Sequence, residues 1–252
     1  MNNRVHLVVP CYRESGRIGV FLHALCRELT GFAGATVQVV EDGSDSAELR
    51  QMTVIIDNLR LEYECLLPLK VLPQNLGKGG AVYAGWGDHQ GADWLAFVDA
   101  DGACAASEVS KLLNLAIENP EPSHSPSAIF ASRVKMLGRQ VDRLFQRHLL
   151  GRIYATLVSE TLDIPVYDSQ CGLKVLPRVA FERIQEHLVI RGFAFDVELM
   201  VALLDTGCPI REIPIDWREV AGGKVNLLRD SWLMARDVMR IRSRRYVWKS
   251  LG

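Results

Sequence analysis

The sequence predicts a single α/β domain in which a mostly parallel sheet is flanked by helices. Short apolar runs, typical of buried strands, alternate with segments of helical periodicity four times within the first hundred residues. Each run ends in a cluster of turn-forming polar residues. The 252 residues, of which 48% are hydrophobic and 23% charged, suffice for one large domain, and no internal repeat divides them.

In the first half, strand and helix follow each other in order. The expected strands cover residues 5–9, 36–40, 69–72 and 94–98. The first strand is expected to stop at Pro10, because proline cannot donate a hydrogen bond to a sheet. The helices between these strands are expected before Gly31, over about 46–61, and from the glycine-rich stretch NLGKGG onward.

The second half is less regular. Helical periodicity predicts helices at about 107–118, 140–161 and 195–206, and residues 129–132 form a further expected strand. The stretch ENPEPSHSPS, rich in proline and serine, is expected to be a surface loop.

Composition argues against several classes of protein. The formal net charge of −1 gives no general attraction to nucleic acid, so no such partner is expected. The six cysteines include no Cys-x-x-Cys pair, which is typical of reduced thiols in the cytosol and not of a zinc site or a disulfide framework. The first residues do not resemble a signal peptide, and no run of eighteen apolar residues occurs. We therefore expect a soluble or peripheral protein.

Polar clusters follow the four expected strands of the first half, namely PCYRE, EDGSD, NLGKGG and DADG. Ligands bind beyond the carboxyl ends of the strands in open parallel sheets, so these clusters predict one shared pocket. Asp99 and Asp101 are separated by one residue and can face the same side of an extended chain. Two close carboxylates repel each other unless a cation lies beside them, and Mg²⁺ or Mn²⁺ prefers oxygen ligands. The alternative is that both aspartates cap the next helix or close a turn.

Lys78 lies in the glycine-rich stretch and is a candidate to bind an anion at the start of the following helix. The stretch lacks the Lys-Ser/Thr spacing of a nucleotide-binding P-loop. The alternative is that its glycines only form a tight turn.

Short motifs carry a family resemblance over nearly the whole chain. VVPCYRE, VVEDGSD, NLGKGGAVYAGW and FVDADG resemble the nucleotide-binding half of family 2 glycosyltransferases, which have the GT-A fold. DSQCGLKVLPR, GFAFDVEL and EIPIDWREVAGGKVN, with ASR at 131–133, resemble the second half of polyprenyl-phosphate sugar transferases. The resemblance is greatest to dolichyl-phosphate glucosyltransferases and then to dolichyl-phosphate mannose synthases.

The resemblance implies a GT-A catalytic domain over residues 1–220, with a nucleotide-sugar half at 1–105 and an acceptor half at 106–220. It implies that the nucleotide sugar contacts Pro10, Tyr12, Glu14, Val40, Asp42, Lys78, Asp99, Ala100 and Asp101. Glu41 stands where the family usually has an aspartate, which keeps the charge. Asp99 and Asp101 would hold Mg²⁺ or Mn²⁺, with Asp101 as the direct ligand. Ala103 stands where the mannose synthases have a further ligand, so water or the diphosphate would complete the metal shell.

The acceptor implied by the resemblance is a lipid phosphate. The candidates to hold its phosphate or the diphosphate, or to line its site, are Arg133, Arg147, Arg152, Lys174, Asp196 and Lys224. Arg133 and Lys224 are also assigned to catalysis, together with Asp99 and Asp101. The alternative for each cation is a solvated surface side chain, and for Asp196 a helix N-cap.

The expected reaction is transfer of glucose or mannose from UDP-glucose or GDP-mannose to polyprenyl or dolichyl phosphate, with inversion at the anomeric carbon. A soluble phosphorylated acceptor is one alternative, and a non-catalytic nucleotide-sugar-binding subunit is another. A nucleotidyltransferase fits less well, because PCYRESGR is a poor version of the glycine-rich basic loop that it needs.

Residues 221–252 form a basic amphipathic segment. Between 229 and 249 there are seven arginines and lysines against two aspartates, which gives +5. One stripe of this helix carries Leu228, Trp232, Ala235 and Met239. The stripe is expected to pack on the domain core, with a membrane surface as the alternative. Many relatives have a membrane helix, so we expect peripheral attachment at the cytoplasmic, inner face of a membrane, or a separate membrane partner.

Overall fold

The computed structural model describes all residues except 1–3, 89–90, 119–125, 143–144 and 221–226. The main sheet has seven strands in the order β3-β2-β1-β4-β7-β5-β8, and a small second sheet pairs β6 with β9. The strands are β1 Val5–Cys11, β2 Ala35–Glu41, β3 Lys70–Val71, β4 Trp94–Val98, β5 Ala128–Ser132, β6 Val141–Asp142, β7 Leu173–Pro177, β8 Ile210–Pro214 and β9 Trp217–Arg218. Within the main sheet β7 runs antiparallel to β4 and β5, and the other pairs are parallel. The predicted α/β fold with a mostly parallel sheet is confirmed.

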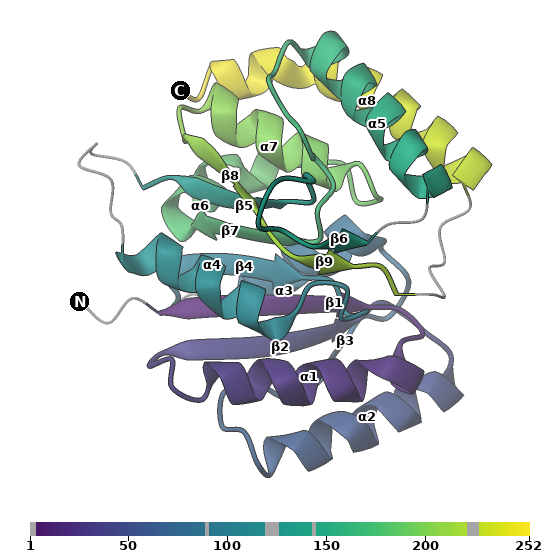
Figure 1. Ribbon diagram of the computed structural model, residues 1–252, viewed down its shortest axis with the longest axis vertical. Helices are drawn as coiled ribbons and strands as arrows, with labels where there is room; N and C mark the ends of the chain where they lie inside the picture. Colours follow the sequence, from purple (N-terminus) through teal and green to yellow (C-terminus); the bar gives the residue numbers. More distant parts are fainter. Residues whose placement is uncertain (1–3, 89–90, 119–125, 143–144, 221–226) are drawn as a thin grey trace.

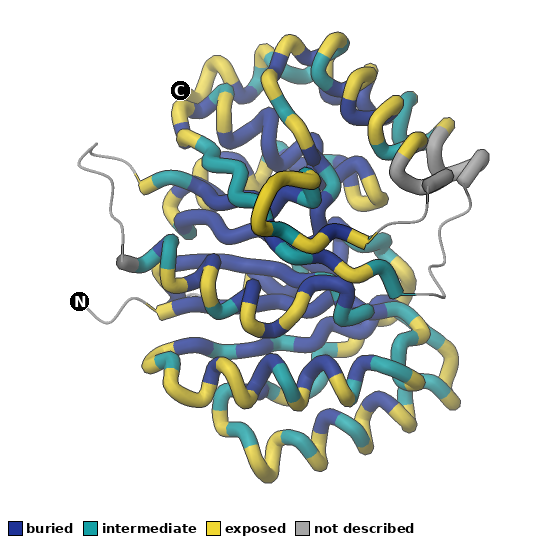
Figure 2. Tube along the Cα trace, in the orientation of Figure 1, coloured by how far each residue is buried: buried dark blue, intermediate teal, exposed yellow. Residues whose placement is uncertain are grey.

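Helices cover both faces of the main sheet (Figure 1). They are α1 Ser15–Leu29, α2 Ser46–Arg60, α3 Lys78–Asp88, α4 Ala106–Glu118, α5 Phe145–Leu162, α6 Arg178–Ile184, α7 Phe195–Asp205 and α8 Leu227–Lys249. One hydrophobic core lies between the sheet and α1, α2 and α4, and the other lies between the sheet and α3, α5, α6, α7 and α8. Figure 2 shows the central strands as the most continuously buried part of the chain.

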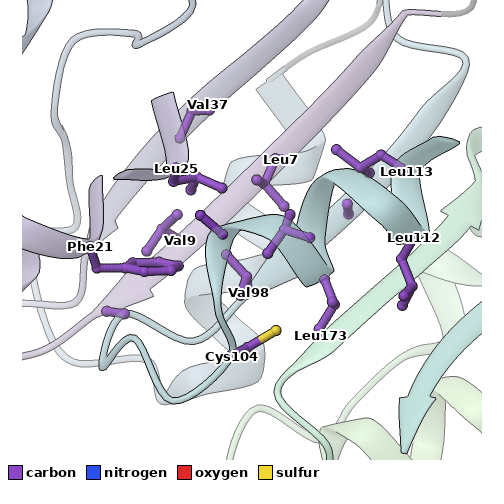
Figure 3. Packing of buried hydrophobic residues seen from close by; sticks show 14 of the residues in the cluster. Leu7, Val9, Phe21, Leu25, Val37, Val98, Cys104, Leu112, Leu113 and Leu173 are labelled. Atoms are coloured by element: carbon purple, nitrogen blue, oxygen red, sulfur yellow. The ribbon is translucent and has the colours of Figure 1, made fainter. Parts of the chain in front are cut away.

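The side-chain alternation of β1 connects the two cores. Leu7 and Val9 point to one face, where Figure 3 shows them beside Leu25 of α1. Val8 points to the other face and joins the second core. A strand with both faces buried explains why its sequence is apolar throughout.

The first strand extends beyond the predicted end at Pro10. β1 continues to Cys11 and pairs with β2 over its whole length, whereas β4 pairs only with Val5–Val8 of β1. Pro10 therefore lies past the end of the β4 pairing, where its missing N–H removes no ladder bond.

The C-terminal helix corrects the prediction made for its apolar stripe. Trp232 and Met239 are exposed, whereas Val238, Ile241 and Trp248 are buried in the second core. The stripe that packs on the domain is therefore a different one, and the stripe expected to face the core faces outward. The side chain of Leu228 lies outside the described residues.

No helix in the described part of the chain is both long enough and apolar enough to cross a bilayer. The proposed division into residues 1–220 and 221–252 stays a prediction.

Candidate active site

Asp99 begins the segment that follows β4, and two neighbours fix its position. Its backbone N–H donates to the carbonyl oxygen of Gly172 (2.9 Å). Its carboxylate Oδ1 lies 2.7 Å from Nζ of Lys78. A Cβ placed on Gly172 would come within 2.1 Å of Oδ2 of Asp99, so only glycine leaves room for this carboxylate. The loop before β7 and the start of α3 thus hold Asp99 at the edge of the sheet.

Asp101 lies in the turn that follows, next to Gly102 with its positive φ of 72°. Its Oδ1 accepts a hydrogen bond from the backbone N–H of Ala103 (3.0 Å). Burial raises the pKa of Asp101, and the nearby charge of Asp99 raises it further. A carboxylate whose charge is disfavoured by burial and by a neighbouring carboxylate suits a bound cation.

A divalent ion fits the chemistry of this pair, because Mg²⁺ and Mn²⁺ prefer carboxylate and phosphate oxygens. Among the described residues no group of three or more His, Cys, Asp or Glu side chains is placed to hold a metal ion. Asp99 and Asp101 stay the predicted ligands of such an ion, which would take its other oxygens from substrate or water.

Lys78 is the first residue of α3 and reaches toward two carboxylates. Burial lowers the pKa of Lys78, but the charges of Asp99 and Asp196 outweigh this effect and raise the pKa above its usual value. The ammonium group also lies over the rings of Phe97 (5.3 Å) and Phe195 (5.7 Å). Lys78 is thus a charged neighbour of the candidate metal carboxylates.

Lys174 and Asp196 do not line the site in this structure, which contradicts the expectation that they contact the acceptor. Both side chains are buried, and Nζ of Lys174 lies 2.6 Å from Oδ1 of Asp196 and donates to the carbonyl oxygen of Cys171 (2.8 Å). β7 directs Lys174 between the sheet and α7, because alternate residues of a strand point to opposite faces. The pair is an internal ion pair with no access to a substrate phosphate.

Arg133 follows β5 and forms a bidentate ion pair with Asp168. Its Nε and Nη2 donate to the two carboxylate oxygens at 2.7 Å each, and its backbone N–H donates to Oδ2 at 2.9 Å. Its guanidinium lies 5.1 Å from the ring centre of Trp217. Burial alone would lower the pKa of Arg133, but Asp168 outweighs this effect and keeps the side chain charged. Glu212 in turn accepts hydrogen bonds from the backbone N–H groups of Tyr167 and Asp168.

The loop after β1 brings Tyr12 and Glu14 to the same edge of the sheet. Both side chains are partly buried, and Glu14 accepts a hydrogen bond from Nη2 of Arg17 (2.9 Å). The loop turns at Arg13, whose φ of 55° is rare for a residue with a side chain. The backbone N–H of Arg13 donates to Oγ of Ser44 (3.0 Å), which joins the loops after β1 and β2.

Asp42 joins the loop after β2 to the glycine-rich segment. Its carboxylate accepts hydrogen bonds from the N–H groups of Leu76 (2.6 Å) and Gly77 (2.9 Å). Burial raises the pKa of Asp42, although these two hydrogen bonds act in the opposite direction. Glu41 accepts from the N–H of Ser44, so both acidic residues hold loops in place.

The other predicted site residues differ in burial, and the side chains of two of them are not described. Pro10, Val40 and Ala100 are buried. Arg152 is exposed on α5. Lys224 and the side chain of Arg147 lie outside the described residues.

Sequence reasoning missed several contacts that shape the site. Arg17 of α1 pairs with Glu14 and its charge acts on Asp101, and only the spacing of three residues from Glu14 could have indicated it. Local sequence could not predict the contact of Gly172 with Asp99. It also could not predict the hydrogen bonds from the Asp168 loop to Glu212, because these partners lie far apart in the sequence.

Comparisons with known proteins agree on one family. Residues 6–184 match glycosyl transferase family 2. A dolichyl-phosphate beta-glucosyltransferase of Saccharomyces cerevisiae is 35% identical over 247 residues, which cover 94% of this chain and 73% of that protein. The dolichyl-phosphate beta-glucosyltransferase of Homo sapiens is 30% identical over 252 residues, covering 96% and 75%. The structure of glucosyl-3-phosphoglycerate synthase from Mycobacterium tuberculosis with UDP superposes with a TM-score of 0.66 at 15% identity, covering 96% of this chain and 80% of that one, and it supports the fold.

Proposed function

Because the chain belongs to glycosyl transferase family 2, we propose that it transfers glucose from UDP-glucose to dolichyl phosphate or a related polyprenyl phosphate. The names of the relatives from Saccharomyces cerevisiae and Homo sapiens favour glucose over mannose. The UDP in the structurally similar synthase favours UDP-glucose over GDP-mannose. The observation that carries the proposal is the meeting of Asp99, Asp101 and Lys78 at the carboxyl edge of the sheet.

The donor diphosphate is expected at Asp99 and Asp101, together with Mg²⁺ or Mn²⁺. A structurally similar synthase contains Mn²⁺ and UDP. When bound, the ion would neutralise the negative charge that develops on the departing diphosphate. The nucleoside is expected to contact the loops after β1 and β2, where Tyr12, Glu14 and Asp42 lie.

In the expected reaction, an oxygen of the acceptor phosphate forms a bond to the anomeric carbon. The bond from that carbon to the donor diphosphate breaks, and its electron pair leaves with the nucleoside diphosphate. Attack from the face opposite the leaving group inverts the configuration. A phosphate is already anionic near neutral pH, so the site has to position it and does not have to remove a proton.

The acceptor phosphate is expected on the side of Arg133. Asp168 fixes the guanidinium in one orientation, which limits the rotamer freedom lost on binding an anion. Lys224, Arg147 and Arg152 remain candidates for the same phosphate. A cytoplasmic, peripheral position at the membrane, with or without a membrane partner, also remains part of this proposal.

A transfer assay tests the proposal. Purified protein with Mg²⁺ or Mn²⁺ is given radiolabelled UDP-glucose or GDP-mannose, and dolichyl phosphate in detergent or 3-phosphoglycerate in water. We expect label from UDP-glucose in the lipid fraction, and its loss in Asp101→Ala. The anomeric configuration of the product, determined by NMR, tests inversion.

Other results would overturn the proposal in distinct ways. Label in the lipid fraction from GDP-mannose alone would make the protein a mannosyltransferase. Transfer to 3-phosphoglycerate alone would favour a soluble phosphorylated acceptor. Binding of UDP-glucose without transfer to either acceptor would indicate a nucleotide-sugar-binding subunit.

A further inference from the structure

The outward side of α8 carries a row of large apolar side chains. Trp232, Met239 and Tyr246 are 67%, 56% and 73% exposed. They are spaced seven residues apart and therefore lie along one line of the helix. The buried residues Val238, Ile241 and Trp248 occupy the opposite side and anchor the helix to the domain. The exposed row therefore lies on the side of α8 that faces away from the core.

Basic side chains flank this row. Arg236 and Arg240 lie on one side of the row and Arg242 lies on the other, by their positions around the helix, and all three are exposed. Within residues 232–249 the one carboxylate is Asp237, which is buried and accepts a hydrogen bond from Arg236 (2.9 Å). The exposed side of this stretch is thus apolar along its middle and positive at its margins.

α8 is fixed to the domain at both ends of its described part. Nε2 of Gln170 contacts the sulfur of Met234 at 3.9 Å, and Arg245 forms an ion pair with Asp205 of α7. Gln170 lies two residues before Gly172, whose carbonyl oxygen accepts a hydrogen bond from the backbone N–H of Asp99. α8 therefore passes beside the loop that shapes the candidate active site at Met234.

A second exposed apolar row lies on the neighbouring helix. Leu149, Ile153 and Leu157 of α5 are exposed at a spacing of four residues. α5 packs against α8, and Figure 1 shows both helices with their amino ends toward the edge where the parallel strands end. The two helices thus bring exposed apolar side chains to the side of the molecule where the acceptor is expected.

We propose that the outward side of α8, defined by Trp232, Met239, Tyr246 and the flanking arginines, lies on the surface of an anionic lipid bilayer. A helix with an apolar line, a tryptophan and basic margins suits the boundary between headgroups and acyl chains. Negative headgroups complement the arginines. This inference rests on the proposed function, since a lipid acceptor has to be reached at a membrane.

A second copy of the chain fits this surface less well. A two-fold contact would bring the same surfaces together and place arginine rows close to one another. Among the described residues of the surface, no exposed carboxylate offsets that repulsion.

Vesicle flotation tests the proposal directly. The full chain is mixed with vesicles of phosphatidylcholine alone, or of phosphatidylcholine with about one third phosphatidylglycerol, at low and high salt. We expect binding to the anionic vesicles and weaker binding at high salt. The triple variant Trp232→Ser, Met239→Ser, Tyr246→Ser should bind at least about tenfold less tightly. Arg240→Gln with Arg242→Gln should lose most of the preference for anionic vesicles.

A matched control removes apolar side chains from the opposite end of the molecule. Val20, Val54 and Leu61, on and after α1 and α2, are 84%, 59% and 87% exposed. The variant with serine at these three positions should bind vesicles like the wild type. Equal loss in both triple variants would overturn the proposal, because it would indicate general hydrophobic adsorption.

Two further measurements keep this proposal separate from the proposed function. Light scattering after gel filtration should give the same mass for wild type and the α8 triple variant; a wild-type dimer lost in the variant would make this surface a contact between copies.

Transfer to a short, water-soluble prenyl phosphate does not require a bilayer. If that transfer persists and the wild type fails to bind anionic vesicles, the proposed function stands and the membrane surface is wrong.

Discussion

The two lysine–aspartate pairs beside Phe97 have the same chemistry and differ in solvent access. Lys78 and Asp99 are 2.7 Å apart, and 26% of the Asp99 side chain is exposed at the edge of the sheet. Lys174 and Asp196 are 2.6 Å apart, and Lys174 has no exposed area. The two ammonium groups lie 5.3 Å and 5.4 Å from the centre of the same ring.

This difference separates a pair that can meet a substrate from one that supports the protein internally. At the edge, water or a ligand can replace either partner of Lys78–Asp99. In the interior, loss of one partner leaves the other charge without compensation, which is costly in a medium of low dielectric constant. The same kind of ion pair is therefore open to a ligand in one place and closed to it in the other.

The largest expected effect is on the buried pair. Lys174→Met should lower the free energy of unfolding by about 3–5 kcal/mol, because the buried Asp196 loses its direct partner and keeps only the weaker effect of the Lys78 charge. Denaturant unfolding followed by circular dichroism measures this change. The double variant Lys174→Met, Asp196→Leu should recover most of the loss, since neither charge then remains. A single variant as stable as the wild type would show that Asp196 has another compensating partner.

The edge pair should respond in the opposite way. Asp99→Asn should lower kcat/KM for transfer about 10²–10³-fold, because a carboxylate expected at the metal and diphosphate is lost. Its free energy of unfolding should change far less than that of Lys174→Met. Steady-state kinetics and denaturant unfolding of the same preparation give both values. Unchanged transfer with strongly reduced stability would reverse the roles assigned to the two pairs.

The contact of Gly172 with Asp99 sharpens the comparison further. Gly172→Ala should reduce transfer about tenfold, because its Cβ would occupy the space of the Asp99 carboxylate and displace it. Gly16→Ala is the matched control, since a Cβ at Gly16 meets no atom within 4 Å. Equal activity of the two variants would mean that the position of Asp99 is not critical.

The smallest expected effect is the pH dependence of the buried pair. Burial raises the pKa of Asp196 above its usual value. A group whose pKa is higher in the folded state contributes stability that is present below its unfolded pKa and lost as pH rises through its folded pKa. The wild type should therefore lose stability relative to Asp196→Asn as pH rises above about 4, the usual pKa of an aspartate, through the acidic range. The free energies of unfolding of both proteins, determined across this pH range, measure this loss. A gain of stability with rising pH would show that the ion pair with Lys174 lowers the pKa of Asp196.

Much of the sheet and its strand ends could be predicted from local pattern. β4 has the predicted bounds, and α1 ends before Gly31 as predicted. The aspartates after β4 could be placed at the edge of the sheet because parallel strands end together. The same periodicity could not choose between the two apolar stripes of α8, since each is compatible with a buried side.

The sequence by itself determined the α/β class, the succession of strands and helices, the family, and the position of Asp99 and Asp101 after a buried strand. The family rests on the resemblance of its short motifs. The other properties depend on residues close together in the chain, whose periodicity and spacing are visible directly. The tertiary structure alone decided that Asp168 holds Arg133, that Gly172 makes room for Asp99, that Lys174 is internal, and which side of α8 faces outward. These properties depend on which distant segments pack together and on how much solvent they exclude, and neither quantity is written in local sequence.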